Sequence, residues 1–144
     1  MIIISKFKYK NILPIIRYID NMCFNEYEIY DDDYLLNLIK LCSIYIAIDN
    51  IKNTIIGYMI IENKENINYL HSIAILPKYQ NQKIGTCLLN YIPHNSILLC
   101  VKRTNFIAQK LYINCGFIKK SIIKNYYLIS NNEYEDAIIM SKNI

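Results

Sequence analysis

The residues best suited to chemistry lie in a polar segment between two apolar runs. The first run, 67–76, ends at Pro77, a polar loop follows over 78–83, and a helical pattern begins near Lys83. A strand that passes into a helix in this way directs several backbone N–H groups and the positive end of a helix dipole at one point, which suits a pyrophosphate. Gly85 would let the backbone approach a phosphate closely. A plain structural turn has the same pattern, so the loop alone leaves both interpretations open.

A second polar pattern lies on the predicted helix over 105–115. Asn105, Ala108 and Tyr112 are three and four residues apart and therefore share one face. A phenol, with an ordinary pKa of about 10, stays protonated at neutral pH and can give its proton to a thiolate, whose conjugate acid has a pKa of about 8.5. Tyr112 could thus be a general acid or a core tyrosine. Asn105 could contact a ligand, cap the helix, or do both.

Together the two segments resemble motifs of the GNAT superfamily of N-acetyltransferases. The first is similar to the acetyl-CoA signature Arg/Gln-x-x-Gly-x-Gly/Ala, in which Gln80 and Gly85 match and Lys83 replaces the first glycine. Residues 105–117 fill every fixed position of the later motif Asn-x-x-Ala-x-x-Leu-Tyr-x-x-x-Gly-Phe. Residues 124–140 look like those of the ribosomal-protein-alanine and related protein N-terminal acetyltransferases. The resemblance covers residues 54–142.

The resemblance implies acetyl-CoA as co-substrate and assigns a role to each matching residue. The backbone of one strand end would pair with the pantetheine arm and stabilise an oxyanion near Ile75; these residues are Ile73, Ala74 and Ile75. The loop would cradle the pyrophosphate with Gln80, Asn81, Gln82, Lys83, Ile84, Gly85 and Thr86. Asn105 would contact the cofactor, and Tyr112 would protonate the leaving thiolate. Tyr69, Tyr126 and Tyr127 would bind the acceptor, although tyrosines at these positions could equally form cross-strand aromatic packing.

No residue of this sequence matches the general base of the family. Bacterial relatives carry glutamate and some eukaryotic relatives histidine at the position of Cys100, and a buried cysteine is usually an inert small hydrophobe. His71 and Tyr69 should share a face of the preceding strand and could take the proton directly or through water, although His71 could also be a structural histidine. Roughly a fifth of an α-amine of pKa about 8 is neutral near pH 7.4, against about a thousandth of a lysine amine. A site without a carboxylate base therefore favours N-terminal α-amines.

Two other functions remain open at this stage. One is acetylation of a small amine, an amino sugar or a polyamine, for which the acidic run 31–33 is the only suitable charge cluster. The other is a non-catalytic acyl-CoA-binding or partner-binding module, which Cys100 and Lys83 would permit. In each case an auxiliary subunit or a homodimer could be required.

The composition narrows the class of protein. The 144 residues suffice for a single domain, 1–144, and the net charge of +4 is scattered, which argues against nucleic-acid binding. Five cysteines without a Cys-x-x-Cys pair argue against disulfides and zinc, so no metal is expected. No apolar stretch reaches about 20 residues, and the run after Met1 is too short for a signal peptide. We therefore expect a cytoplasmic protein without membrane contact.

Apolar periodicity and turn residues predict the order of elements. Strands are expected over 2–9, 43–49, 54–62, 67–76, 96–101, 117–127 and 135–141, and helices over 13–24, 34–41, 84–92 and 105–115. The three central strands should form an antiparallel meander with turns at 50–53 and 63–66. This order predicts an α/β (α+β) protein with the GNAT fold, a mixed, mostly antiparallel seven-stranded sheet flanked by about four helices.

Overall fold

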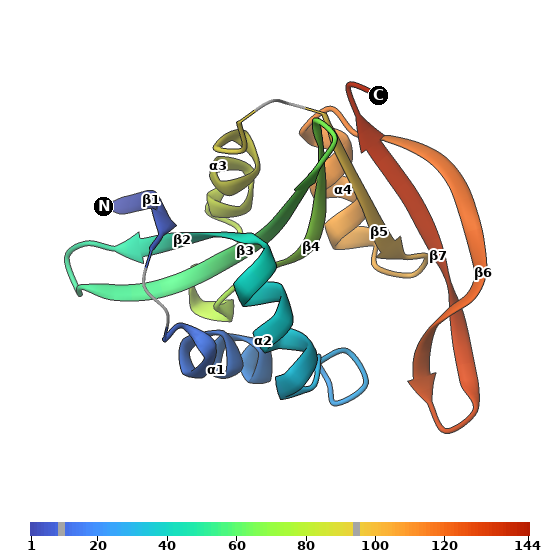
Figure 1. Cartoon of the computed structure of the whole chain (residues 1–144), viewed down its shortest axis with the longest axis horizontal. Coiled ribbons are helices and arrows are strands. Elements are labelled where there is room, and N and C mark those ends of the chain that lie inside the picture. The colour runs from blue at the N-terminus through green and yellow to red at the C-terminus, as the bar shows by residue number, and fades with distance from the viewer. Residues whose placement is uncertain (9–10, 94–95) are drawn as a thin grey trace.

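The computed structural model describes residues 1–8, 11–93 and 96–144 and confirms the predicted order of elements (Figure 1). The strands are β1 (Ile2–Phe7), β2 (Ser43–Asp49), β3 (Thr54–Lys64), β4 (Ile67–Ile75), β5 (Ile97–Lys102), β6 (Ile118–Ser130) and β7 (Glu133–Lys142). The helices are α1 (Leu13–Cys23), α2 (Asp32–Leu41), α3 (Ile84–Asn90) and α4 (Phe106–Asn114), and the short 3-10 helix η1 (Pro77–Tyr79) follows β4. The last residue of the strand predicted over 2–9 lies outside the described residues.

All seven strands form one sheet in the order β1-β2-β3-β4-β5-β7-β6. Every neighbouring pair is antiparallel except β4 and β5, which are parallel. One core lies between the sheet and α1 and α2, and it contains Ile16, Leu35 and Tyr58. A second core on the opposite face contains Leu88 of α3 and Tyr112 of α4. The mixed, mostly antiparallel seven-stranded sheet with four α-helices is thus confirmed.

Two turns are shorter than the sequence predicted. The turn expected over 63–66 contains only Glu65 and Asn66, because β3 and β4 stay paired up to Lys64 and Ile67. Both turn residues have positive φ, 49° and 70°, the backbone that suits a tight two-residue hairpin. Likewise, β6 and β7 extend to a turn over 131–132 instead of flanking a longer loop.

The parallel pair β4 and β5 is joined at one end only. Its pairing runs from Asn68 opposite Ile97 to Leu70 opposite Leu99 and stops there. The Asn68 N–H donates to the Ser96 carbonyl at 2.9 Å and holds the strands together at this end. Beyond Leu70 the two strands diverge (Figure 1). The remainder of β4, over 71–75, therefore has a backbone edge on the β5 side that pairs with no described strand, and this divergence of the two strands is called the opening below.

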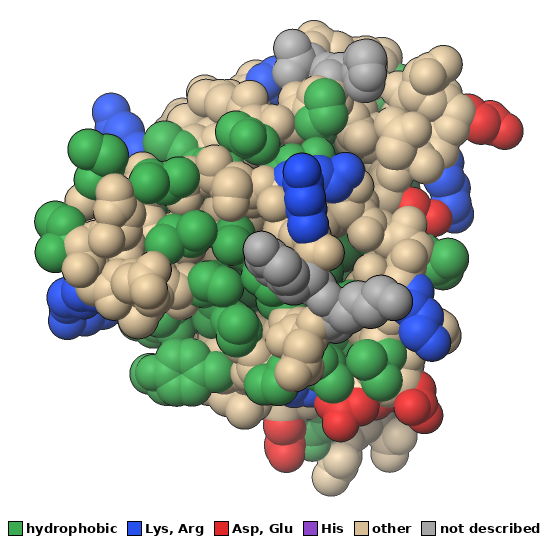
Figure 2. All heavy atoms as spheres, turned by 60° about the vertical axis from the view of Figure 1, so that its left-hand side comes forward, with side chains coloured by type: hydrophobic (Ala, Val, Ile, Leu, Met, Phe, Trp, Pro, Cys, Tyr) green, Lys and Arg blue, Asp and Glu red, His purple; other side chains and the backbone are tan. Residues whose placement is uncertain are grey.

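On one face of the molecule, charge is spread rather than gathered. On the face shown in Figure 2, the lysine and arginine side chains lie in separate small groups, and apolar side chains gather between them. Among the described residues, no helix has the length and apolar character needed to cross a membrane.

Candidate active site

The loop after β4 holds two residues in left-handed backbone, and one of them is Lys83, which replaces a glycine of the signature. Asn81 and Lys83 have φ values of 63° and 62°, which is the left-handed region. A glycine adopts this backbone without steric cost, whereas an L-residue with a Cβ does not. The side-chain amide of Gln80 donates to the Ile75 carbonyl at 2.9 Å and closes the loop onto the end of β4.

The backbone of this loop presents unused donors. Within the described residues, the N–H groups of residues 81–86 donate to no carbonyl or side chain. The N–H groups of the first turn of a helix have no acceptor in the same helix, and α3 begins at Ile84. These donors are therefore available to an anionic ligand.

A hydrogen bond that the sequence did not predict ties the loop to the β2–β3 hairpin. The Tyr79 hydroxyl donates to Asp49 Oδ2 at 2.7 Å, and Asp49 Oδ1 accepts from the N–H groups of Ile51 at 3.1 Å and Lys52 at 3.2 Å. These bonds, that from Tyr79 first, hold the pKa of Asp49 below its usual value. The position of the loop therefore depends on a carboxylate about thirty residues away in the sequence.

Gly85 has a packing role in addition to any contact with a phosphate. A Cβ added at Gly85 would lie 3.2 Å from Cδ2 of Leu111, so the glycine lets α3 approach α4 closely. The two helices also meet where the Cys115 thiol lies 3.9 Å from the Thr86 hydroxyl. A side chain at position 85 would require Leu111 of α4 to shift.

Helix α4 places its motif residues as the sequence predicted. The Asn105 side chain accepts from the Ala108 N–H at 3.1 Å, which confirms the helix cap. Tyr112 is 6% exposed and its ring lies 5.5 Å from that of Phe117, centroid to centroid. Burial raises the pKa of Tyr112 above the usual value for a phenol, so it is protonated at neutral pH. Gly116 follows the helix with φ 97°.

Every second residue of β4 over 71–75 directs its backbone N–H and C=O groups toward the opening. The Leu76 N–H donates to the Ile56 carbonyl on β3. Because backbone N–H and C=O groups alternate in direction along a strand, those of Ile73 and Ile75 point toward the opening and those of Ala74 point toward β3. The Ile75 carbonyl already accepts from Gln80 and from the Cys23 thiol at 3.2 Å.

The predicted acceptor residues gather on the face of the sheet opposite Tyr112. Leu99 and Val101 of β5 point into the core under α3 and α4, so Cys100 between them points to the α1 and α2 side. The Tyr69 and His71 rings lie 4.7 Å apart. Burial and a hydrogen bond with Cys100 raise the pKa of Tyr69. The two faces of the opening thus carry different candidate groups.

Glu62, which the sequence analysis missed, is the partner of His71. Its Oε1 lies 2.8 Å from His71 Nε2, and Oε2 lies 3.2 Å from the Lys64 ammonium. The hydrogen bond from His71 and that from Lys64 hold the pKa of Glu62 below its usual value. A bulge creates the contact: Ile60 pairs with Ser72 but Ile61 pairs with Leu70, so His71 is an extra residue in β4.

Two chain segments close over these groups. Between α1 and α2, the Tyr30 hydroxyl donates to the His71 carbonyl at 3.1 Å, and burial, followed by the neighbouring Tyr34, raises the pKa of Tyr30 to about 12. In the same segment Glu28 pairs with Lys102 of β5 at 2.9 Å. From the other side, the Tyr127 ring lies 6.0 Å from the Lys102 ammonium.

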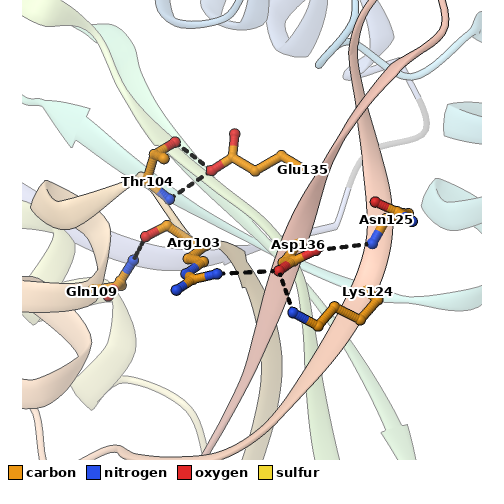
Figure 3. A network of polar contacts seen from close by, with 7 residues as sticks. All are labelled: Arg103, Thr104, Gln109, Lys124, Asn125, Glu135 and Asp136. Carbon is orange, nitrogen blue, oxygen red and sulfur yellow. Dashed lines mark hydrogen bonds and ion pairs between the residues drawn. The ribbon is translucent and has the colours of Figure 1, made fainter.

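A polar network orients the hairpin that carries Tyr126 and Tyr127 (Figure 3). Ile123 pairs with Ala137 and Tyr127 pairs with Glu135, so three residues of β6 face only Asp136. Asp136 fills this bulge: it accepts from the Asn125 N–H at 3.1 Å and pairs with Lys124 and Arg103, each at 3.3 Å. Glu135 accepts from the Thr104 N–H at 2.6 Å. The network fixes this hairpin to the turn between β5 and α4.

Comparison with known proteins shows the family. Residues 40–119 match the family model described as acetyltransferase (GNAT) domain. The chain belongs to the GNAT acetyltransferase family. It is 34% identical over 97 residues to ribosomal protein bS18-alanine N-acetyltransferase of Haemophilus ducreyi. This alignment covers 62% of this chain and 67% of that protein. The protein of the same name from Escherichia coli is 35% identical over 79 residues, 50% of this chain and 53% of the relative. The aligned region thus spans between half and two thirds of these relatives.

Solved structures share the GNAT fold over almost the whole chain. The ribosomal-protein-alanine N-acetyltransferase from Escherichia coli superposes with a TM-score of 0.85 at 24% identity and covers 99% of this chain and 93% of its own. Arabidopsis thaliana Naa50, solved with a bisubstrate analogue, superposes with a TM-score of 0.78 at 24% identity over 99% of each chain. An Elizabethkingia anophelis GNAT acetyltransferase, solved with acetyl-CoA bound, superposes with a TM-score of 0.77 at 20% identity over 99% of this chain and 98% of that one.

Proposed function

We propose that this chain transfers an acetyl group from acetyl-CoA to the α-amine of a protein N-terminus. The observation that carries the proposal is the opening between β4 and β5, with Tyr112 on one face and Tyr69, His71 and Cys100 on the other. A thioester in this opening could be approached by an amine from the α1 and α2 side while its sulfur faces α4.

The donor side would bind acetyl-CoA through backbone groups. Residues 81–86 offer N–H donors to the pyrophosphate, and the exposed Lys83 adds a positive charge beside them. The N–H groups of Ile73 and Ile75 face the opening, where they can bind the pantetheine arm and stabilise the oxyanion of the tetrahedral intermediate. Asn105 lies at the start of α4 and would contact the cofactor while it caps the helix.

The chemical step would be direct transfer in a ternary complex. The neutral amine attacks the thioester carbonyl, a C–N bond forms, and the C–S bond then breaks. Tyr112 gives its proton to the departing thiolate. His71 takes the proton that the amine loses, directly or through water, and the Glu62 carboxylate stabilises the imidazolium that forms.

Three features favour an N-terminal α-amine as acceptor. The relatives with the matching sequences are named as alanine N-acetyltransferases of a ribosomal protein. A carboxylate is absent from position 100, which suits an amine that is partly neutral at physiological pH. The aromatic walls at Tyr30, Tyr126 and Tyr127 suit the first residues of a peptide.

The polyamine alternative is weakened at two of the three acidic residues that supported it. Asp31 accepts from the Tyr34 N–H at 2.8 Å and caps α2, and Asp32 pairs with Arg17 at 2.5 Å. Both carboxylates therefore have structural roles.

Mass spectrometry of acetyl transfer tests the proposal. The acceptors are peptides with varied first residues, N-blocked lysine peptides, polyamines and glucosamine phosphate, each incubated with acetyl-CoA and either wild type or Tyr112→Phe. We expect acetylated N-termini and a loss of roughly 10²-fold or more in kcat in the variant, the lower range for loss of general acid catalysis. Transfer to lysine side chains or polyamines without transfer to N-termini would refute the acceptor, and full activity of Tyr112→Phe would refute the acid.

A further inference from the structure

We propose that Cys42, Glu62 and His71 form a zinc-binding site on the acceptor side of the sheet, and that zinc bound there blocks acetyl transfer. The binding half of this proposal stands on the geometry alone, and it departs from the expectation that no metal binds, because strand pairing brings together ligands that are far apart in the sequence. The inhibitory half rests on the proposed function, because it requires that His71 accept the proton of the amine.

Three adjacent strands bring the donor atoms together. Ser43 pairs with Ile61, so Cys42, directly before β2, lies beside Glu62 of β3, and Glu62 contacts His71 of β4. The thiol sulfur, one carboxylate oxygen and one imidazole nitrogen all lie within 4.8 Å of one another. Among the described residues no other group of cysteine, histidine and acidic side chains comes so close.

The distances fit a tetrahedral ion after small side-chain movements. Zinc binds sulfur at about 2.3 Å and nitrogen or oxygen at about 2.0–2.1 Å, so its ligand atoms lie about 3.3–3.6 Å apart. The 2.8 Å contact between His71 and Glu62 must open slightly, and the sulfur must approach. Sheet pairing fixes the backbones of Glu62 and His71, and the Cys42 N–H donates to Leu38 at 2.8 Å. Side-chain rotation alone therefore suffices to bring the three ligand atoms to zinc-binding distances.

Burial and charge also suit the ion. The side chains of His71 and Glu62 are 13% and 21% exposed, which leaves room for water as the fourth ligand. Lys64 pairs with Oε2 of Glu62 while His71 contacts Oε1, so a metal in place of the histidine contact can leave the lysine pair intact. One thiolate and one carboxylate place two negative charges beside a divalent ion, and the carboxylate also pairs with Lys64.

The donor set selects zinc over magnesium or calcium. Sulfur and imidazole nitrogen are typical zinc ligands, whereas magnesium and calcium prefer oxygen alone. Burial, followed by the neighbouring Glu62 carboxylate, raises the pKa of the Cys42 thiol to about 11, so the thiol is protonated when no metal is bound. On binding, the S–H bond breaks, the S–Zn bond forms, and the proton passes to solvent.

Cobalt serves as a spectroscopic probe of the site. The whole chain, kept reduced with a phosphine, is titrated with Co²⁺, and the thiolate-to-cobalt charge-transfer band is recorded in the near ultraviolet. Cys42→Ser tests the sulfur ligand, and Cys87→Ser is the matched control because Cys87 is the exposed thiol among the five free cysteines. We expect a band that saturates at one Co²⁺ per chain in wild type and in Cys87→Ser, and none in Cys42→Ser. Equal bands in wild type and Cys42→Ser, or no band in wild type, would overturn the site.

Zinc titration then tests the inhibitory half. We expect calorimetry to give at least tenfold weaker zinc binding in Cys42→Ser. At a free zinc concentration that halves the activity of wild type and of Cys87→Ser, Cys42→Ser should keep almost all of its own activity. Equal inhibition of all three proteins, or no inhibition at saturating zinc, would overturn the inhibitory role. Were the chain to transfer no acetyl group to any acceptor, the cobalt band would still decide whether the site exists.

Discussion

Replacing Lys83 by glycine should stabilise the protein, because Lys83 holds a backbone conformation that favours glycine. Its φ of 62° and ψ of 19° lie in the left-handed region, which costs an L-residue roughly 1–2 kcal/mol. Glycine avoids this cost but loses more entropy on folding, about 0.5–1 kcal/mol. The net gain is about 0.5–1 kcal/mol. With an unfolding entropy of about 2.1 cal/mol/K per residue, this raises the Tm by about 2–3 °C.

Lys83→Ala separates the backbone effect from the charge effect. Alanine keeps a Cβ in the same conformation, and the lysine side chain is exposed, so alanine should leave the Tm almost unchanged. Both variants lose the charge beside the proposed pyrophosphate, so the KM for acetyl-CoA should rise equally in both, by up to about fivefold for an exposed pair. Calorimetric melting of wild type and both variants gives the comparison. A glycine variant no more stable than the alanine variant would refute the strain argument.

Three further predictions follow from named contacts. Tyr79→Phe removes the hydrogen bond to Asp49 that holds the loop, which costs about 1 kcal/mol. Steady-state kinetics should therefore show a several-fold higher KM for acetyl-CoA with kcat little changed. An equal fall in kcat would contradict this positioning role. Glu62→Gln keeps a hydrogen bond to His71 but removes the charge that stabilises the imidazolium, so kcat should fall roughly tenfold, part of the usual gain from proton transfer, and an unchanged kcat would contradict the role of Glu62 in stabilising the imidazolium. Asp20 is 2% exposed and its pKa is raised by burial, so its protonated form favours the fold, and this contribution is lost as the pH rises through the folded pKa. Asp20→Asn, which can still accept from Tyr58, should therefore raise the urea midpoint at pH 8 and much less near pH 4, and an equal effect at both values would contradict the assignment.

Local signals in the sequence determined the order of the elements and the position of the proposed donor side of the site. Asn105 caps α4, Gly116 ends it with positive φ, and the loop after Pro77 leads into α3, as predicted. Each of these features depends on residues within a few positions of one another. The family motifs are built from the same short segments, so their spacing sufficed to locate Tyr112.

The tertiary structure alone decided the contacts of the proposed acceptor side, because they depend on strand register. The predicted turn over 63–66 would have placed Glu62 opposite Ile67, whereas the two-residue turn at Glu65 and Asn66 places it opposite Tyr69. The bulge at His71 then brings the imidazole to Glu62. Register follows from the fit of whole strands against two cores and from turn geometry, and no short stretch of sequence contains that information.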